Sequence, residues 1–431
     1  MTTPRIARIL IVDDSAVMRS LLRTVISTDK RLETVGTATD GASALRAMDA
    51  LRPDLILLDV EMPVMDGLST LKQMRMRGTK VPVIMCSSLT QRGARVTIEA
   101  LASGAADYVA KPSGQPSRDA AVQALASDLI PKILVLTSMT PTAPPPFALG
   151  FGGPVPVGSA HGPGGHGSGP SLAAGAPHGP SPAGVYSHGP APASSGHSHG
   201  GAWAPPHGIP GGGAQPAAMR LQPMSSNHTV LVIGVSTGGP AALDVLLPTL
   251  PASFPLPVLV VQHMPELFTK MLAERLATRC PLRVREATSG EPVRPGAILV
   301  AKGNWHMEVA TASTAHTPVI RLQQEAPENH CRPAVDVLFR SAVQVYGSGV
   351  LGVILTGMGS DGFAGCRLIR EHAGTVLAQD QATSAVWGMP GVVAQAGMAH
   401  RVLPLNSIAP EILRLAGRGQ REAIELREST V

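Results

Sequence analysis

A long stretch without any charged side chain divides this chain. Residues 133–219 contain no Lys, Arg, Asp or Glu and are rich in Pro, Gly, Ala and Ser, with seven histidines. Such a composition cannot bury enough apolar surface to offset the entropy that ordering costs. We therefore expect a disordered linker over residues 133–224, between a first domain over residues 1–132 and a second over residues 225–431. A flexible coil of this length spans about 50 Å.

Composition narrows the possible classes of protein. The four cysteines lie far apart without a CxxC pair, which fits a reducing compartment and argues against a disulfide framework or a cysteine-based zinc site. The isoelectric point near 9.2 reflects a small excess of basic residues. There are 17 basic and 14 acidic residues up to residue 132, and 18 and 16 from residue 220 onward. Since no basic stripe results, we expect no nucleic-acid partner.

No part of the sequence predicts insertion into a membrane. No run of 18 apolar residues occurs, and Asp13 and Asp14 interrupt the only early apolar run, so a secretory signal is not expected. We expect a cytoplasmic protein with no direct membrane insertion.

Polar residues follow four apolar runs of the first domain. The segments "ARILIVDDS", "PDLILLDVEM", "VPVIMCSS" and "ADYVAKP" each predict a strand that ends at polar residues. Alternating strands and helices predict an open parallel sheet, whose carboxyl ends share one edge. That edge would gather Asp13, Asp14, Asp59, Ser87 and Lys111. Three carboxylates repel one another unless a hard cation such as Mg²⁺ joins them, and Lys111 and Ser87 could then bind a phosphate.

The first domain resembles the receiver domain of two-component response regulators over its whole length. The motifs "VDDS", "LLDVEMPVMDG", "SSLT" and "DYVAKP" occur in the right order and spacing. The resemblance implies a flavodoxin-like fold, a histidine kinase as phosphodonor, and Mg²⁺ as cofactor. It also implies that Asp59 is the phosphorylation site. The magnesium site would consist of Asp13, Asp14, Asp59 and the carbonyl of Glu61. The switch residues would be Ser87, Tyr108 and Lys111.

A serine, a histidine and an aspartate follow three apolar runs of the second domain. "TVLVIGVS" ends at Ser236, "PLPVLVVQH" ends at His263, and "GVLGVILTGMGSD" leads into a glycine-rich loop with Asp361. On a doubly wound sheet these ends lie on one edge, where a nucleophile, its general base and an orienting carboxylate could assemble. A helix beginning after Ser236 would also leave the backbone N–H groups of residues 237–239 free to stabilise an oxyanion.

Other interpretations of the turn after residue 235 fit less well. "GVSTG" matches the GxSxG elbow of α/β-hydrolases, but those enzymes have the order Ser, acid, His, whereas the order here is Ser, His, Asp. "GVSTGG" lacks the second glycine of a dinucleotide fingerprint, and no P-loop ending is present. Each residue alone also has a structural explanation, as a helix cap for Ser236, a hydrogen-bonded strand-end residue for His263 and a turn former for Asp361.

The whole arrangement resembles the chemotaxis protein-glutamate methylesterase/deamidase family, which joins a receiver to a catalytic domain. The matching segments are "IGVSTGGPAAL", "VVQHMPELFTKMLAERL", "PGAILVAKGNWHMEV", "RPAVDVLFRSAV", "ILTGMGSDGFAG" and "VWGMPGVVAQAG". The resemblance implies a Rossmann-like catalytic domain without a cofactor, with Ser236 as nucleophile, His263 as general base and acid, and Asp361 as its orienting group. The backbone around Thr237 and Met358 would surround the oxyanion.

The same resemblance implies the reaction and its control. The enzyme would hydrolyse glutamate γ-methyl esters on the cytoplasmic helices of chemoreceptors, releasing methanol, and would deamidate specific glutamines. The receiver would cover the serine until it is phosphorylated. Two features differ from the family as we expect it: the linker is longer, and Cys331 in "NHCRPAVD" stands where a polar loop residue is expected.

Two other functions are weighed against this one. A receiver could be joined to a catalytically silent domain that docks onto receptors or a kinase, but such a domain does not need Ser, His and Asp at three strand ends. A DNA-binding output would need a helix-turn-helix and a basic patch, and neither is predicted.

Overall fold

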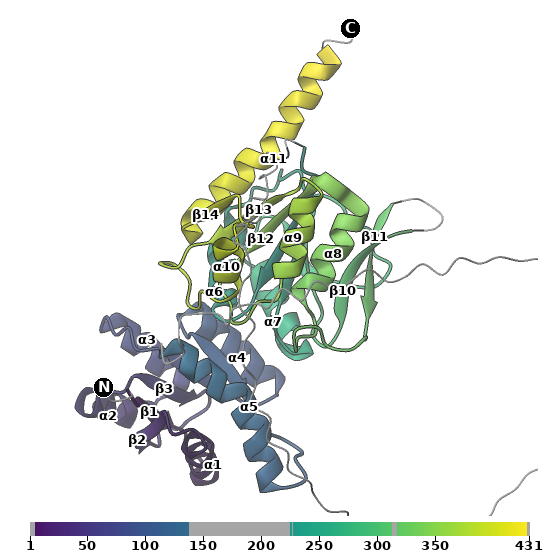
Figure 1. Cartoon of the computed structure of the whole chain (residues 1–431). Coiled ribbons are helices and arrows are strands. Elements are labelled where there is room, and N and C mark those ends of the chain that lie inside the picture. The colour runs from purple at the N-terminus through teal and green to yellow at the C-terminus, as the bar shows by residue number, and fades with distance from the viewer. Residues whose placement is uncertain (1–4, 138–224, 226, 313–316, 429–431) are drawn as a thin grey trace, which may run out of the picture. The chain divides into compact units, whose positions relative to one another are not determined.

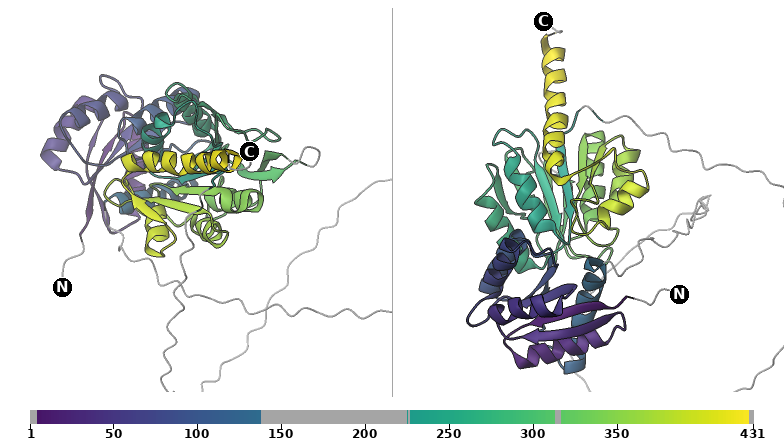
Figure 2. Two further views of the ribbon diagram at one scale, coloured as in Figure 1. Left: turned by 90° about the horizontal axis from the view of Figure 1, so that it is seen from above. Right: turned by 90° about the vertical axis from the view of Figure 1, so that its left-hand side faces the viewer.

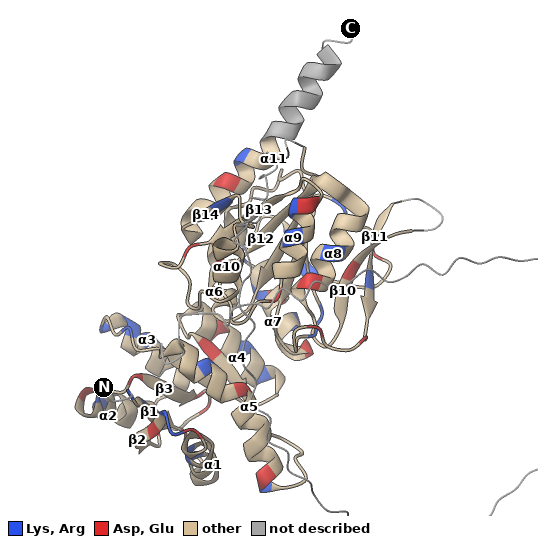
Figure 3. Cartoon of the chain, viewed as in Figure 1, with Lys and Arg blue, Asp and Glu red and all other residues tan. Residues whose placement is uncertain are grey.

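The computed structural model describes residues 5–137, 225, 227–312 and 317–428 (Figure 1). The described residues all belong to one compact unit. The linker was expected over residues 133–224, and its residues 138–224 lie outside the described residues, so its unusual length stays a prediction. Basic and acidic residues are interspersed over the described helices and strands (Figure 3).

The first domain has a parallel sheet of five strands in the order β2-β1-β3-β4-β5. This order is flavodoxin-like and confirms the predicted fold. The elements in chain order are β1 (Ala7–Val12), α1 (Ala16–Ser27), β2 (Leu32–Ala38), α2 (Gly41–Leu51), β3 (Leu55–Asp59), α3 (Gly67–Met76), β4 (Val83–Ser87), α4 (Gln91–Ala102), β5 (Asp107–Ala110) and α5 (Arg118–Leu136).

Two differences from the sequence-based expectation concern the edges of this domain. Strand β2 was not predicted, because its sequence "LETVGTA" lies half exposed at the sheet edge and contains no apolar run. Helix α5 continues to Leu136, past the boundary expected at residue 132, and buries Ile133 and Leu134 against the core. The charge-free stretch therefore begins inside a packed helix.

The second domain has a parallel sheet of seven strands in the order β14-β13-β12-β6-β7-β9-β8, with a separate antiparallel pair β10-β11. The elements are β6 (Val230–Val235), α6 (Gly239–Leu246), η1 (Leu247–Thr249), β7 (Val258–Gln262), α7 (Glu266–Ala277), β8 (Arg283–Glu286), β9 (Ala297–Val300), β10 (His306–Thr311), β11 (Pro318–Gln323), α8 (Val335–Tyr346), η2 (Gly347–Gly349), β12 (Val350–Ile354), α9 (Phe363–Glu371), β13 (Thr375–Gln379), α10 (Met389–Gln395), β14 (Arg401–Leu403) and α11 (Leu405–Glu428). This Rossmann-like order confirms the second predicted sheet.

Helices cover both faces of the seven-stranded sheet (Figure 2). Alternate residues of β6 point to opposite faces, as in any strand. Leu231 and Ile233 belong to the core that includes α6, α7 and α11, while Val230 and Val232 belong to the core that includes α8, α9 and α10. Each such buried side chain contributes about 1.5–3 kcal/mol, so β6 is held firmly between the two layers. None of the described helices combines the length and apolarity that a membrane span requires.

The register of the central strands fixes where the predicted site lies. Strand β6 pairs with β7 on one side and with β12 on the other. Val235 is paired with Gln262, so Ser236 and His263 are the next residues on two adjacent strands. The chain turns from one half of the sheet to the other between β6 and β12, and ligands bind at such a switch point in doubly wound sheets.

The turn after β6 depends on glycine. Gly238 has a φ of +79°, and a Cβ added there would lie 2.6 Å from the Cβ of Ala385. Gly290 has a similar φ of +83° but has nothing within 4 Å of an added Cβ.

We predict that the Gly238→Ala variant is less stable than the Gly290→Ala variant by about 1–3 kcal/mol, the usual cost of overpacking. Both variants carry the same left-handed backbone penalty of about 1–2 kcal/mol, so their difference isolates the steric clash. The measurement is denaturant unfolding of the full chain, followed by a probe in the second domain. Equal losses of stability in the two variants would mean that the loop containing Ala385 moves aside without a measurable free-energy penalty.

Candidate active site

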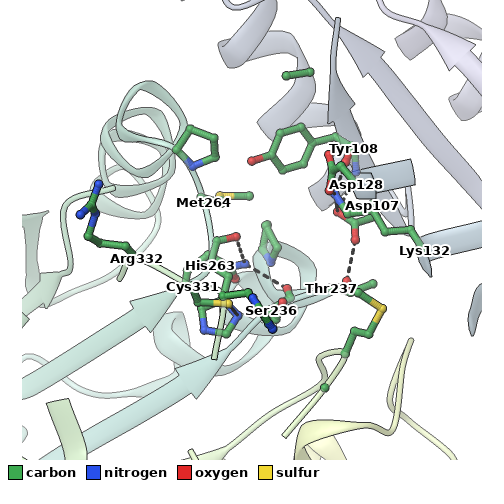
Figure 4. Close-up of a pocket in the computed structure, with 18 of the residues that line it drawn as sticks. Asp107, Tyr108, Asp128, Lys132, Ser236, Thr237, His263, Met264, Cys331 and Arg332 are labelled. Carbon is green, nitrogen blue, oxygen red and sulfur yellow. Dashed lines mark hydrogen bonds and ion pairs between the residues drawn. The ribbon is translucent and has the colours of Figure 1, made fainter. Parts of the chain in front are cut away.

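Ser236 and His263 line one cavity of about 820 Å³ (Figure 4). Asp361 follows β12, in the loop before α9, and lies behind His263 rather than in the lining. His263 Nε2 is 2.8 Å from Asp361 Oδ2. The structure therefore brings the three predicted residues together at adjacent strand ends.

The Asp361 carboxylate is only 3 % exposed and receives five hydrogen bonds. Two of the donors are the backbone N–H groups of Val335 and Asp336, at 2.6 and 3.1 Å, which open helix α8. Ala334, the residue before helix α8, has no side chain that could cap the helix. Asp361, in another loop, instead accepts the hydrogen bonds of the first backbone N–H groups of the helix. Burial by itself raises the pKa of Asp361, but the hydrogen bonds from His263 and from these N–H groups outweigh burial and lower it.

His263 uses both ring nitrogens. Nε2 faces Asp361, and Nδ1 is 3.5 Å from the Cys331 sulfur. Burial by itself lowers the pKa of His263, but the hydrogen bonds with Asp361 and Cys331 prevail and raise it to about 9. The Ser236 hydroxyl forms no hydrogen bond with any described residue, so the predicted contact between serine and histidine is not made directly in this state.

The backbone around Ser236 departs in one respect from the expectation. The N–H of Gly239 donates to the carbonyl of Ser236 at 2.8 Å, because helix α6 already begins there, so it is not free for an oxyanion. The N–H groups of Thr237 and Met358 donate to no described group and remain available. Thr237 and Met358 both line the cavity beside Ser236.

Two further polar residues of the site were not predicted. The Asn329 amide donates to Asp361 Oδ1 at 2.9 Å and to Asp336 Oδ2 at 3.0 Å, so it bridges two buried carboxylates. Burial and the nearby Asp361 charge raise the pKa of Asp336 to about 6, although a hydrogen bond from the Gly365 N–H opposes them. The "NHCRPAVD" segment was the available signal, since it places three polar side chains just before a helix.

The predicted acidic edge of the first domain also assembles. Carboxylate oxygens of Asp13, Asp14 and Asp59 lie within 4.8 Å of one another. Lys111 Nζ is 2.8 Å from both Asp13 Oδ2 and Asp59 Oδ1. Asp13 and Asp59 are buried, and burial raises the pKa of Asp59 although Lys111 opposes the shift. Converging hard oxygen donors, one of them the exposed Asp14, fit a partly hydrated Mg²⁺ ion.

The remaining receiver residues occupy different places. The Glu61 side chain is exposed and pairs with Arg92. Ser87 is buried at the end of β4, where its hydroxyl accepts a hydrogen bond from Thr97 at 2.7 Å. The Tyr108 ring is buried and stacks on Phe268 of α7, with ring centroids 4.4 Å apart.

Residues of the first domain line the same cavity as Ser236 and His263. They include Asp107, Tyr108 and Lys132. The Thr237 hydroxyl donates to Asp107 Oδ2 at 2.5 Å (Figure 4). Strand β5 of the receiver-like sheet is thus bonded directly to the residue after Ser236.

Comparison with known proteins agrees with this architecture. Residues 231–412 match the model of the family described as CheB methylesterase, and residues 9–123 match that of the response regulator receiver domain. A protein-glutamate methylesterase/protein-glutamine glutaminase of a Nocardioides species is 45 % identical over 411 residues, which cover 95 % of this chain and 96 % of that protein. This chain belongs to the CheB methylesterase family.

Two other members of the CheB family match well. The protein-glutamate methylesterase/protein-glutamine glutaminase of Trichodesmium erythraeum is 40 % identical over 416 residues, covering 95 % of this chain and 99 % of that protein. The crystal structure of the Thermotoga maritima CheB methylesterase catalytic domain is 42 % identical and covers 44 % of this chain and 99 % of that chain, with a TM-score of 0.43. The relatives from Nocardioides and Trichodesmium, 45 % and 40 % identical over nearly their full length, confirm the predicted family resemblance.

Proposed function

We propose that this chain hydrolyses glutamate γ-methyl esters on chemoreceptors and deamidates specific receptor glutamines, with Ser236 as the nucleophile. The 2.8 Å contact between His263 and the buried Asp361, one strand away from Ser236, carries the proposal. A docking domain has no use for a buried carboxylate that orients an imidazole in a cavity. The substrates are inferred from the names of the relatives. Cytoplasmic receptor helices as substrate imply a cytoplasmic enzyme.

The proposed reaction proceeds through an acyl-enzyme. The Ser236 oxygen attacks the side-chain carbonyl carbon while His263 Nδ1 takes the hydroxyl proton. The same proton then goes to the leaving methoxide or amine, which departs as methanol or ammonia. The N–H groups of Thr237 and Met358 can hold the oxyanion. Water, deprotonated by His263, hydrolyses the acyl-enzyme and restores the serine.

The proposed control is phosphorylation of Asp59 by a histidine kinase of the chemotaxis pathway. Asp13, Asp14, Asp59 and the Glu61 carbonyl would hold Mg²⁺, which when bound neutralises the charge of the incoming phosphoryl group. Lys111 would bind a phosphoryl oxygen, and Ser87 and Tyr108 would respond to it. Since β5 carries both Tyr108 and Asp107, the response would reach the hydrogen bond to Thr237.

We predict that Ser236→Ala abolishes methanol release from methylated receptor, with a loss on the order of 10⁴-fold or more, because the Ser236 oxygen is the atom that forms the acyl-enzyme. The matched control is Ser289→Ala, since Ser289 lies away from the three strand ends and accepts one backbone hydrogen bond. Methanol is measured over time with the full chain. Turnover of Ser236→Ala near that of Ser289→Ala would exclude the serine mechanism.

The raised pKa of His263 predicts the pH dependence. Only the neutral imidazole can take a proton, so kcat/KM should rise about tenfold per pH unit until it levels near the pKa of about 9. Asp361→Asn removes the carboxylate that stabilises the imidazolium. The rise of kcat/KM with pH should therefore move to lower pH, and the maximal rate should fall. Asp244→Asn is the control, because the Asp244 carboxylate pairs with Arg275 and Arg279 and does not contact His263. If kcat/KM of the parent levels off near pH 6.5, and Asp361→Asn does not shift that pH, the proposed role of Asp361 is contradicted.

We predict that Asp107→Ala raises the basal rate of unphosphorylated enzyme about two- to tenfold, the worth of one net hydrogen bond. Asp128→Ala is the matched control, because Asp128 also pairs with Lys132 but has no contact with Thr237. Equal basal rates in the two alanine variants would show that the Thr237 contact does not restrain the enzyme.

We also expect a small-molecule phosphodonor with Mg²⁺ to stimulate the parent enzyme but not the Asp59→Asn variant.

A further inference from the structure

Among the described residues, Cys331 is the one cysteine that has an imidazole as its partner. Cys86 and Cys366 are fully buried in the cores, where burial raises the pKa of both thiols. Cys280 is partly exposed, but burial and the Asp244 charge raise its pKa to about 11. Cys331 is also partly exposed, lines the cavity, and lies 3.5 Å from His263 Nδ1 (Figure 4).

A tight turn holds the Cys331 thiol in place. The backbones of Glu328 and Cys331 exchange two hydrogen bonds of 2.9 and 3.1 Å. The two residues between them, Asn329 and His330, have φ angles of +52° and +63°, the pattern of a type I′ turn. The two oxygens of Glu328 accept hydrogen bonds from Arg340 at 3.1 and 2.8 Å, which ties the turn to helix α8. The position of the sulfur is therefore built into the fold.

The arrangement of these side chains matches that of an activated thiol. A thiol beside an imidazole can transfer its proton to the ring nitrogen, which leaves the nucleophilic thiolate beside an imidazolium. Asp361, bonded to the other ring nitrogen, stabilises that imidazolium. The same His263 and Asp361 that would activate Ser236 thus also serve Cys331.

We propose that Cys331 is a reactive thiol and an oxidation site of the catalytic cavity, and that its oxidation by hydrogen peroxide switches the enzyme off. The thiolate sulfur attacks one peroxide oxygen, so the S–O bond forms as the O–O bond breaks. The departing hydroxide takes the proton of the His263 imidazolium and leaves as water, and the sulfur is oxidised to a sulfenic acid. The added oxygen lies between the sulfur and Nδ1 and blocks access of Ser236 to that nitrogen.

The reactivity of the thiol is tested independently of any esterase activity. The full chain is treated with limiting iodoacetamide at neutral pH, and each cysteine-containing peptide is quantified by mass spectrometry. Cys331 should be alkylated about tenfold faster than Cys280, and His263→Ala should abolish that advantage because the proton acceptor is gone. If His263→Ala leaves labelling equal or faster, exposure alone governs the reaction and the activation is overturned.

The switch is tested with hydrogen peroxide on the full chain, and it rests on the proposed function of Ser236 and His263. Activity of the parent should fall and return after addition of a dithiol, which reduces the sulfenic acid while forming its own disulfide and water. Each variant is compared with its own untreated activity. Cys331→Ala should resist peroxide, whereas the matched variant Cys280→Ala should be inactivated like the parent.

The outcomes separate the two proposals. Inactivation of Cys331→Ala at the parental rate would overturn the switch. If Cys331→Ala does not fold, trapping of a sulfenic acid on the parent's Cys331 peptide with a 1,3-diketone decides, and its absence in the inactivated enzyme overturns the proposal. Rapid, His263-dependent labelling in a chain without esterase activity would support the reactive thiol while rejecting the proposed function.

Discussion

The buried carboxylate of Asp361 is the interaction on which the second domain's site depends. An isolated carboxylate is expensive to bury, and a partner must compensate it. Here the compensation comes from three directions: the imidazole of His263, the first turn of helix α8, and the amide of Asn329. Because one carboxylate satisfies all three, the helix cap and the orientation of the histidine cannot change independently. This coupling fixes the direction of the imidazole, as its proposed role as general base requires.

The elements that carry the site could be predicted from the sequence because they are buried parallel strands. Such strands read as continuous apolar runs, and the first polar residue after each run marks the sheet edge. This was enough to place Ser236, His263 and Asp361 together, and the acidic edge of the receiver likewise. Strand β2 gave no such signal, since an edge strand with one exposed side contains polar residues at half of its positions.

The rest of the site arises from long-range geometry that no local pattern encodes. That Asn329 bridges two carboxylates, and that Asp361 caps α8, depends on how the loop before α8 packs against the loop after β12. The end of α5 was misplaced for a related reason. Composition predicts disorder from the absence of charge, but Ile133 and Leu134 are apolar and pack as the last turn of the helix. A segment without charged residues is therefore not necessarily unfolded, because its apolar residues can be ordered by packing against the core.

The hydrogen bonding of His263 links the two proposed nucleophiles of the cavity, Ser236 and Cys331. Asp361 accepts from Nε2, so only Nδ1 faces the cavity. Cys331 already lies against Nδ1, while the Ser236 hydroxyl has no partner among the described residues. One lone pair cannot serve a thiol and a hydroxyl at once. In the proposed mechanism the contact between Cys331 and Nδ1 must therefore break before Ser236 can be activated. Anything that strengthens that contact would lower the fraction of enzyme ready to react. Cys331 stands where a polar loop residue was expected, and under the proposed function its contact with Nδ1 would set how readily His263 turns to Ser236.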